Sequence, residues 1–148
     1  EDLLVEQATF VLSRIAEHEH PIDRLYAQIR AVHAFHEGRE ARVVFLSQAI
    51  AASAGKRLPE ILAVGTRVFE AHRRDAAERL RKGIAEGLVA PCDAEALVTL
   101  VRAMIDGLML AKVTGAVELP RVHELIWESL LAPLKLSKPE KKQRRGHA

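Results

Sequence analysis

The chain has 148 residues, of which 49% are hydrophobic and only 4% are aromatic, and it carries a formal net charge of +2. This length suits one domain with a sizeable core, and no apolar run reaches the roughly 20 residues that a membrane span needs. The single cysteine, Cys92, excludes an intramolecular disulfide and favours a reducing, cytoplasmic location.

Charge is distributed unevenly along the chain. Residues 135–148 contain six Lys or Arg and one Glu, a net charge of +5, whereas residues 1–134 carry a net charge of −3. A mildly acidic body lacks the basic face that tracks a phosphate backbone. We therefore predict one domain over residues 1–134 and a disordered basic tail over 135–148, with contact between the tail and nucleic acid or an acidic surface as the alternative. Because the first residue is Glu, we expect the sequence to be part of a longer chain.

Apolar residues recur at helical spacing from the start of the chain. The first predicted helix covers about 2–18 and ends before Pro21, because proline disfavours helical geometry at His20. The second helix begins with Pro21 in its first turn and ends at Gly38. A third helix is expected over about 39–54.

Three more helices are predicted in the second half. The fourth is expected over about 58–86. On its charged face, residues of opposite charge stand four positions apart, and such pairs stabilise a helix. Gly87 and Pro91 interrupt the chain, and Asp93 is a suitable N-cap for a fifth helix. A sixth helix is expected over about 118–134. Six helices without a strand signal predict an all-α bundle.

The fifth helix is nearly all apolar between Ala94 and Val113. Its polar exceptions recur every three or four residues and form one narrow stripe: Glu95, Thr99, Arg102 and Asp106. Such a wide apolar surface exceeds one packing contact, so we predict that part of it faces the chain's own core and part faces a second copy. The residues assigned to the chain's own core are Leu97, Val101, Ile105 and Leu108.

The spacing around this helix resembles a known family. Ile84, Gly87, Asp93, Ala96, Leu100, Ala103, Asp106, Gly107 and Leu108 look like the pattern I..G...D..A....A..DGL. That pattern is found in the C-terminal ligand-binding and dimerisation domain of TetR-family transcriptional regulators, and the helix lengths agree over residues 1–134. The family's N-terminal helix-turn-helix is missing from this sequence, so we expect DNA contact only through that domain in the parent protein.

The resemblance implies that the fifth and sixth helices pair with their symmetry mates in a four-helix bundle. The residues allow this independently, because Ala and Gly at steps of four let two helices approach closely. The expected dimer-interface residues are Ala96, Leu100, Ala103, Gly107, Ala111, Val122, Ile126, Trp127 and Leu130. The alternative is that Gly107 is merely tolerated in a tightly packed monomer.

The resemblance also implies a small apolar or amphipathic effector among the first five helices, whose binding changes the spacing of the DNA-reading domains. Candidate ligand-binding residues combine polar groups on apolar faces with large apolar groups: Phe10, Arg14, Tyr26, Ile29, His33, Phe45, Gln48, Phe69, His72 and Met104. The alternative for each is an ordinary core position, and His72, in line with Val, Ala and Leu, is more often a hydrogen-bonded core histidine.

No motif indicates catalysis or a metal site. His33 and His36 share a helical face, but no HExxH occurs, because His123-Glu124 lacks the second histidine. Cys92 precedes a helix N-terminus, where the dipole favours a thiolate, although an idle thiol is the simpler interpretation. The chain has neither a glycine-rich phosphate loop nor a G-x-S-x-G turn. We therefore predict no enzyme activity, no metal and no cofactor.

These observations predict the effector-binding and dimerisation domain of a TetR-like repressor in which a small molecule relieves DNA binding. We expect a cytoplasmic homodimer without membrane contact. The alternative is an all-α homodimeric scaffold or adaptor that binds no ligand. A helix-turn-helix pattern upstream of Glu1 in the parent reading frame would distinguish the two.

Overall fold

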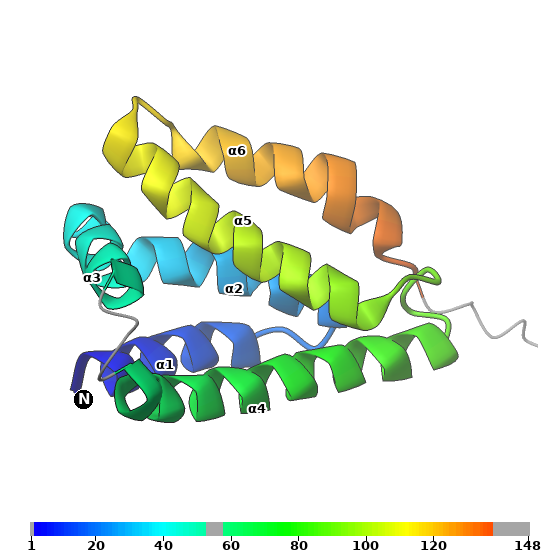
Figure 1. Ribbon diagram of the computed structural model, residues 1–148. Helices are drawn as coiled ribbons and strands as arrows, with labels where there is room; N and C mark the ends of the chain where they lie inside the picture. Colours follow the sequence, from blue (N-terminus) through cyan, green and yellow to red (C-terminus); the bar gives the residue numbers. More distant parts are fainter. Residues whose placement is uncertain (1, 53–57, 138–148) are drawn as a thin grey trace, which may run out of the picture.

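The computed structural model describes residues 2–52 and 58–137, and these form six α-helices (Figure 1). The helices are α1 (Asp2–Ala16), α2 (Pro21–Phe35), α3 (Glu40–Ala52), α4 (Leu58–Ala85), α5 (Ala94–Thr114) and α6 (Leu119–Ile126). The described residues contain no strand, only an isolated bridge between Val89 and Lys135. The predicted all-α class is therefore confirmed. Within the same residues, no helix combines the length and the hydropathy that crossing a membrane requires.

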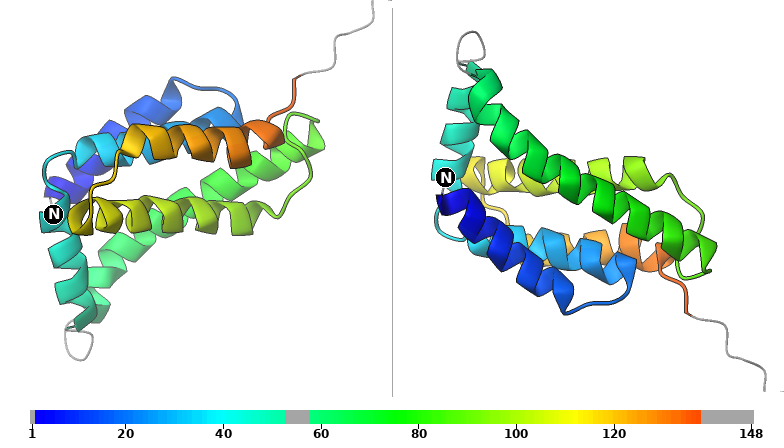
Figure 2. Two further views of the ribbon diagram at one scale, coloured as in Figure 1. Left: turned by 90° about the horizontal axis from the view of Figure 1, so that it is seen from above. Right: turned by 90° about the horizontal axis from the view of Figure 1, so that it is seen from below.

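The helix α2 is central to the packing. It contacts α1, α4 and α5, and its buried residues are Ile22, Leu25, Ile29, Ala31, Val32 and His33. In Figure 1, α1 and α4 lie below α2 and α5, and α6 lies above them. The helix α3 stands across one end of the bundle and packs on α5 (Figure 2).

Local signals at the helix ends explain most of the boundaries. His20 is the N-cap of α2, because its Nδ1 accepts a hydrogen bond from the Ile22 amide at 3.1 Å. Asp93 is the N-cap of α5, with its Oδ1 3.0 Å from the Ala96 amide nitrogen. The predicted N-cap of α5 is thereby confirmed. Both caps satisfy amides that the first turn of a helix leaves without an intrahelical partner.

The C-terminus of α4 is closed by a glycine in the left-handed region. Gly87 has a φ of +75°, which a residue without a Cβ adopts at little cost. The Leu88 amide donates to the Gly83 carbonyl oxygen at 2.8 Å, and the Gly87 amide donates to the Ile84 carbonyl oxygen at 3.2 Å. This pair of bonds is a Schellman motif, and it turns the chain toward α5.

The sixth helix differs from the expected single helix over 118–134. After Ile126 the backbone widens into a π-helical turn at Trp127–Leu131 and then tightens into a 3₁₀ turn at Ala132–Leu134. Pro133 has no N–H with which to continue an α-helix, so the α geometry has to end before it. The π turn adds a residue to the turn and thereby changes the register, and Leu131 is fully buried.

The structure also differs from the expected tail at its beginning. The Ala90 amide donates to the Leu134 carbonyl oxygen at 2.9 Å, and the Leu136 amide donates to the Leu88 carbonyl oxygen at 2.8 Å. We call the hydrogen bonds between residues 88–90 and 134–136 the C-terminal clasp; it closes the right-hand end of the bundle in Figure 1. Residues 138–148 lie outside the described part of the chain.

Two side chains reinforce the clasp. The Lys135 ammonium donates to both carboxylate oxygens of Asp23, at 2.9 and 3.0 Å. The His20 Nε2–H points at the Leu88 carbonyl oxygen (2.9 Å) and lies 3.3 Å from the Leu136 carbonyl oxygen. His20 therefore joins the start of α2 to both segments of the clasp, 88–90 and 134–136.

Candidate functional site

A groove of about 420 Å³ lies between α1, α2 and α4. Its walls are mostly apolar, and its lining residues are Leu12, Ile15, Pro21, Arg24, Leu25, Gln28, Ala71, His72, Asp75, Ala76 and Arg79. Three of these, Arg24, Asp75 and Arg79, interact electrostatically with one another, and we call them the charged edge of the groove. Ile15 and Leu25 are buried, whereas Leu12 is partly open to solvent. A groove of this volume, with few polar groups on apolar walls, has the character of a small-molecule site.

The charged edge of the groove carries two guanidinium groups and one carboxylate. Arg79 donates to Asp75 from the next turn of α4 at 2.8 Å, and Arg24 donates to the His18 carbonyl oxygen at 3.0 Å. Burial lowers the pKa of Arg24, the positive charge of Arg79 lowers it further, and Asp75 opposes both effects. The two guanidinium groups therefore repel each other across an edge with net positive charge.

His72 contributes a neutral polar group to the same groove. Burial lowers its pKa, Asp75 raises it, and the charges of Arg24 and Arg102 lower it again. Because the net direction is downward from 6.5, His72 is mainly neutral at pH 7. A neutral imidazole can donate one hydrogen bond and accept another, and here it can do so within a largely apolar wall.

The other predicted effector residues are distributed elsewhere, and His72 alone among them lines the groove. Ile29 is fully buried in the core, and Met104 packs against the core from α5. Tyr26 lies against Trp127, with ring centroids 4.9 Å apart. Phe10 lies against Phe35 at 5.6 Å.

Several of these candidates lie at the surface. Phe45 is 69% exposed on α3, and Gln48 on the same helix is also exposed. The Arg14 guanidinium lies over the Phe10 ring at 5.2 Å. The Arg102 guanidinium covers the partly exposed Phe69 ring at 4.2 Å. Apolar spacing alone does not show which face of a helix meets the interior, and α3 carries apolar residues on several sides.

A buried histidine pair joins α2 to α6. His33 Nδ1 and His123 Nε2 are 2.7 Å apart, and His33 Nε2 is 2.9 Å from the Ile105 carbonyl oxygen. A carbonyl oxygen only accepts, so His33 Nε2 carries the proton, and in the neutral pair His123 donates to His33 Nδ1. The two ring planes are 7° from parallel and the centroids are 5.0 Å apart, so the rings meet edge to edge along the hydrogen bond.

The pair is held in its neutral form. Burial is the largest cause that lowers the pKa of His33, and Lys112 adds to it, while the Ile105 carbonyl, Asp106 and Glu40 oppose it. For His123, burial and then the charges of His33 and Arg30 lower the pKa to about 4. The sequence places His33 and His36 on one helical face, but the two side chains have different partners. His36 donates from Nε2 to the Gln7 amide oxygen at 2.9 Å.

An ion pair ties α3 to the C-terminal half of α5. The Lys112 ammonium donates to the Glu40 carboxylate, which is buried. Burial raises the pKa of Glu40, but the Lys112 hydrogen bond and backbone amides outweigh it, and the pKa is lowered. This pair helps to hold α3 across the end of the bundle.

One face of α5 remains open. Leu100 is 45% exposed and Leu110 is 41% exposed, and Ala96, Ala103 and Gly107 are exposed between and beside them. We call these five residues the α5 face. The opposite side of the helix is buried at Leu97, Val101 and Ile105, which are the core positions that the sequence predicts, and Leu108 packs partly buried against the core.

The predicted interface residues of α6 are less open than those of α5. Val122, Trp127 and Leu130 are partly buried against the core, and Ile126 is buried. Ala111 of α5 is also partly buried. Leu125, which the sequence did not single out, is 61% exposed.

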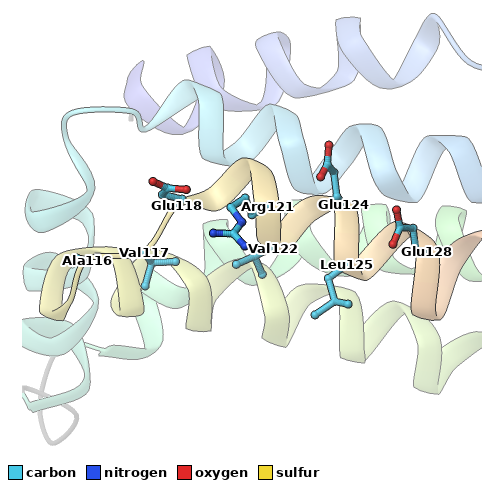
Figure 3. Close-up of a pocket in the computed structure, with 8 residues that line it drawn as sticks. All are labelled: Ala116, Val117, Glu118, Arg121, Val122, Glu124, Leu125 and Glu128. Carbon is cyan, nitrogen blue, oxygen red and sulfur yellow. The ribbon is translucent and has the colours of Figure 1, made fainter.

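A shallow trough runs along α6 beside these residues (Figure 3). It is lined by Ala116, Val117, Glu118, Arg121, Val122, Glu124, Leu125 and Glu128. Val122 and Leu125 project to one side of α6, whereas Glu124 and Glu128 project to the other. All of these residues come from α6, the π turn that follows it and the loop before it, so the trough lacks the opposing wall that a small-molecule site needs.

Cys92 does not have the environment of a reactive thiol. Burial and the neighbouring Asp93 carboxylate raise its pKa, so the thiolate that a helix N-terminus could favour is disfavoured here. Among the described residues, no group of three or more His, Cys, Asp or Glu side chains is placed to hold a metal ion.

Comparisons with known proteins add no identification: no family model, no curated protein and no solved structure matches this chain. The groove and the α5 face are therefore the two features from which we infer a function. The groove offers an apolar site with charged groups at its edge. The α5 face offers a surface that can associate.

Proposed function

We propose that this chain is the effector-binding and dimerisation domain of a TetR-like transcriptional repressor, in which a small molecule relieves DNA binding by the parent protein. The α5 face carries this proposal, because it leaves a continuous apolar strip without an intrachain partner among the described residues. The groove beside α1 provides the effector site, and the order of the six helices agrees with the sequence resemblance.

The composition of the α5 face favours association with a second copy. It contains two leucines, two alanines and a glycine, and no charged residue. The charged neighbours Arg102 and Asp106 pair with each other at 3.1 Å, and Arg102 turns toward Phe69 of α4. Their charges therefore lie to the side of the strip, and two strips can meet without burying unpaired charge.

Gly107 supplies an independent argument. A Cβ built on Gly107 meets nothing within 4 Å, so packing within the chain does not require glycine there. Glycine in the middle of a helix costs about 1 kcal/mol relative to alanine. A close approach of a partner helix at Gly107 accounts for a residue that the isolated fold does not need.

The position of the groove suits coupling to an N-terminal DNA-binding domain. One wall is α1, the first helix of the chain, and another is α4. A ligand that prefers one separation of these helices would move α1 and whatever precedes it. Such coupling needs a differential affinity of about 1 to 3 kcal/mol between the two arrangements.

Light scattering during size-exclusion chromatography tests the dimer. We expect a mass of twice 16.4 kDa at micromolar concentration for the wild-type chain. Leu100→Arg places a charge in the α5 face and should yield a monomer, whereas Phe45→Arg adds the same charge to an exposed site on α3 and should remain dimeric. A monomeric wild-type chain, or a Leu100→Arg variant that stays dimeric, would contradict the proposal.

The parent protein tests the regulatory part. The fluorescence anisotropy of a labelled palindromic DNA should rise when the parent protein binds the DNA and fall again when a groove ligand is added. A dimer whose parent protein lacks DNA binding would instead favour the scaffold alternative.

A further inference from the structure

We propose that the groove between α1, α2 and α4 binds a monocarboxylate with an apolar tail, in which Arg24 and Arg79 hold the carboxylate and Leu12, Ile15 and Leu25 receive the tail. The inference rests on the proposed function in that it names the chemical class of the effector. The binding site itself is defined by the groove and its lining residues.

The net charge of the groove favours a ligand that carries one negative charge. Of its lining residues, Arg24 and Arg79 are cationic and Asp75 is anionic, which leaves one positive charge in excess. His72 adds none, because its pKa is lowered from 6.5. A monoanion neutralises this edge, whereas a dianion would overcompensate it and a cation would increase the repulsion.

The arrangement of the two arginines favours a carboxylate as the anion. Arg79 is held by one carboxylate already, that of Asp75 at 2.8 Å, and Arg24 donates to the His18 carbonyl oxygen with Nη1. A guanidinium has five N–H donors, so each arginine keeps donors for a ligand. The planar fork of a guanidinium matches the two oxygens of a carboxylate.

The rest of the groove is suited to an apolar tail. Ile15 and Leu25 are buried at its base, and Leu12 is exposed on α1, so a tail would cover apolar surface that is now open to water. Ala71 and Ala76 on α4 add no bulk that would block the groove. His72 is the one neutral hydrogen-bonding ring on this wall, and it can orient a polar substituent of the tail.

Isothermal titration of the whole chain with three ten-carbon probes tests the headgroup. The probes are decanoate, decanol and decyltrimethylammonium, each used below the concentration at which it aggregates. We expect decanoate to bind at least about tenfold more tightly than decanol, which corresponds to one charge-assisted contact, and the ammonium probe to bind most weakly.

Two substitutions of opposite sign test the assigned residues. Arg79→Gln should weaken decanoate binding about tenfold and leave decanol binding nearly unchanged. Asp75→Asn removes the competing carboxylate and should strengthen decanoate binding severalfold. Arg81→Gln is the matched control, because Arg81 lies on the same helix, pairs with the exposed Glu95 at 2.7 Å and does not line the groove.

Arg24 is tested in combination because its substitution also removes the hydrogen bond to His18. Arg24→Gln with Arg79→Gln should abolish the preference for decanoate over decanol, and thermal unfolding without a probe should show that the double variant is folded. Equal binding of the three probes, absence of binding, or wild-type decanoate affinity in Arg79→Gln would overturn the proposal.

The outcomes separate this inference from the proposed function. A monomeric chain that binds decanoate through Arg79 would support the groove assignment and contradict the dimer. A dimeric chain that prefers the ammonium probe would support the dimer and contradict the groove assignment.

Discussion

His33 on α2 and His123 on α6 share one hydrogen bond of 2.7 Å, and that bond has room for a single proton. If both facing nitrogens carried a proton, two N–H groups would point at each other inside the core. The pair therefore links the protonation state of the protein to the attachment of α6. Protonation of this pair is therefore one route by which acid can weaken the fold.

Acidification should destabilise the protein between about pH 6.5 and pH 4. The folded-state pKa of His123 is lowered from 6.5 to about 4, so the stabilisation is complete above 6.5 and is lost as the pH falls toward 4. His33, His36 and His72 also have lowered pKa values and act in the same direction. Urea unfolding at a series of pH values measures this loss, which for His123 is on the order of 3 kcal/mol.

His123→Gln should reduce that pH dependence. A glutamine amide can still donate to His33 Nδ1 but does not titrate in this range, so the slope of unfolding free energy against pH should become shallower. His18→Gln, the same substitution at an exposed histidine outside the core, is the control for the effect of the glutamine itself. Identical slopes in wild type and His123→Gln would show that the pair does not carry the acid sensitivity.

Gly83→Ala should destabilise the protein by about 1 to 3 kcal/mol. A Cβ at this position would lie 2.8 Å from Val89 Cγ2 and 3.2 Å from Pro21 Cγ, so α4 could no longer pack closely against them. Chemical denaturation measures the effect, and Gly83→Ala combined with Val89→Ala should recover part of the clash energy. Helix propensity alone predicts the opposite sign, since alanine is the better helix former.

Gly107→Ala should differ between monomer and dimer. In the Leu100→Arg background, which we expect to be monomeric, the new Cβ meets nothing and should raise stability by up to about 1 kcal/mol. In the wild-type background the same methyl group would push into the partner helix, and the gain should disappear. Urea unfolding at one protein concentration, with and without Gly107→Ala in each background, gives the comparison. Equal gains in the two backgrounds would argue against a close approach at Gly107.

His20→Ala should lower stability by about 1 to 2 kcal/mol, because it removes the N-cap of α2 and the link to the clasp. His20→Asn separates the two roles, because asparagine is a good N-cap but its side chain is too short to reach Leu88 as well. We expect Asn to recover part of the loss. His18→Ala is the matched control. In thermal unfolding we expect His20→Ala to be the least stable of the three variants, His20→Asn to be intermediate and His18→Ala to be the most stable.

Local sequence signals were sufficient for much of the fold. Gly87, Pro91 and Asp93 correctly predicted the junction before α5, because a left-handed glycine, a proline and a capping carboxylate act within one turn of the backbone. The buried positions Leu97, Val101 and Ile105 followed from apolar spacing. These features depend on residues that are neighbours along the helix.

Features that depend on distant segments were not predictable in this way. His33 and His123 are far apart in the chain, and only their places on otherwise apolar helix faces could have suggested that they meet. Of the residues that line the groove, only His72 was predicted from the sequence as an effector contact. Arg24 and Arg79 come together through the packing of α2 with α4, which no local pattern shows. The π turn after Ile126 was also missed, because it changes the helical register without a glycine or another clear local signal inside it.

The C-terminal clasp has a further consequence for how the molecule opens. Because residues 88–90 hold residues 134–136, the α5–α6 hairpin is tied at the end opposite its own loop and forms a closed cycle of chain. Ala90 and Leu136 lie outside every helix, yet their amide hydrogens should exchange with deuterium as slowly as those in the middle of α5. The cycle would then behave as one cooperative block that is released in a single event.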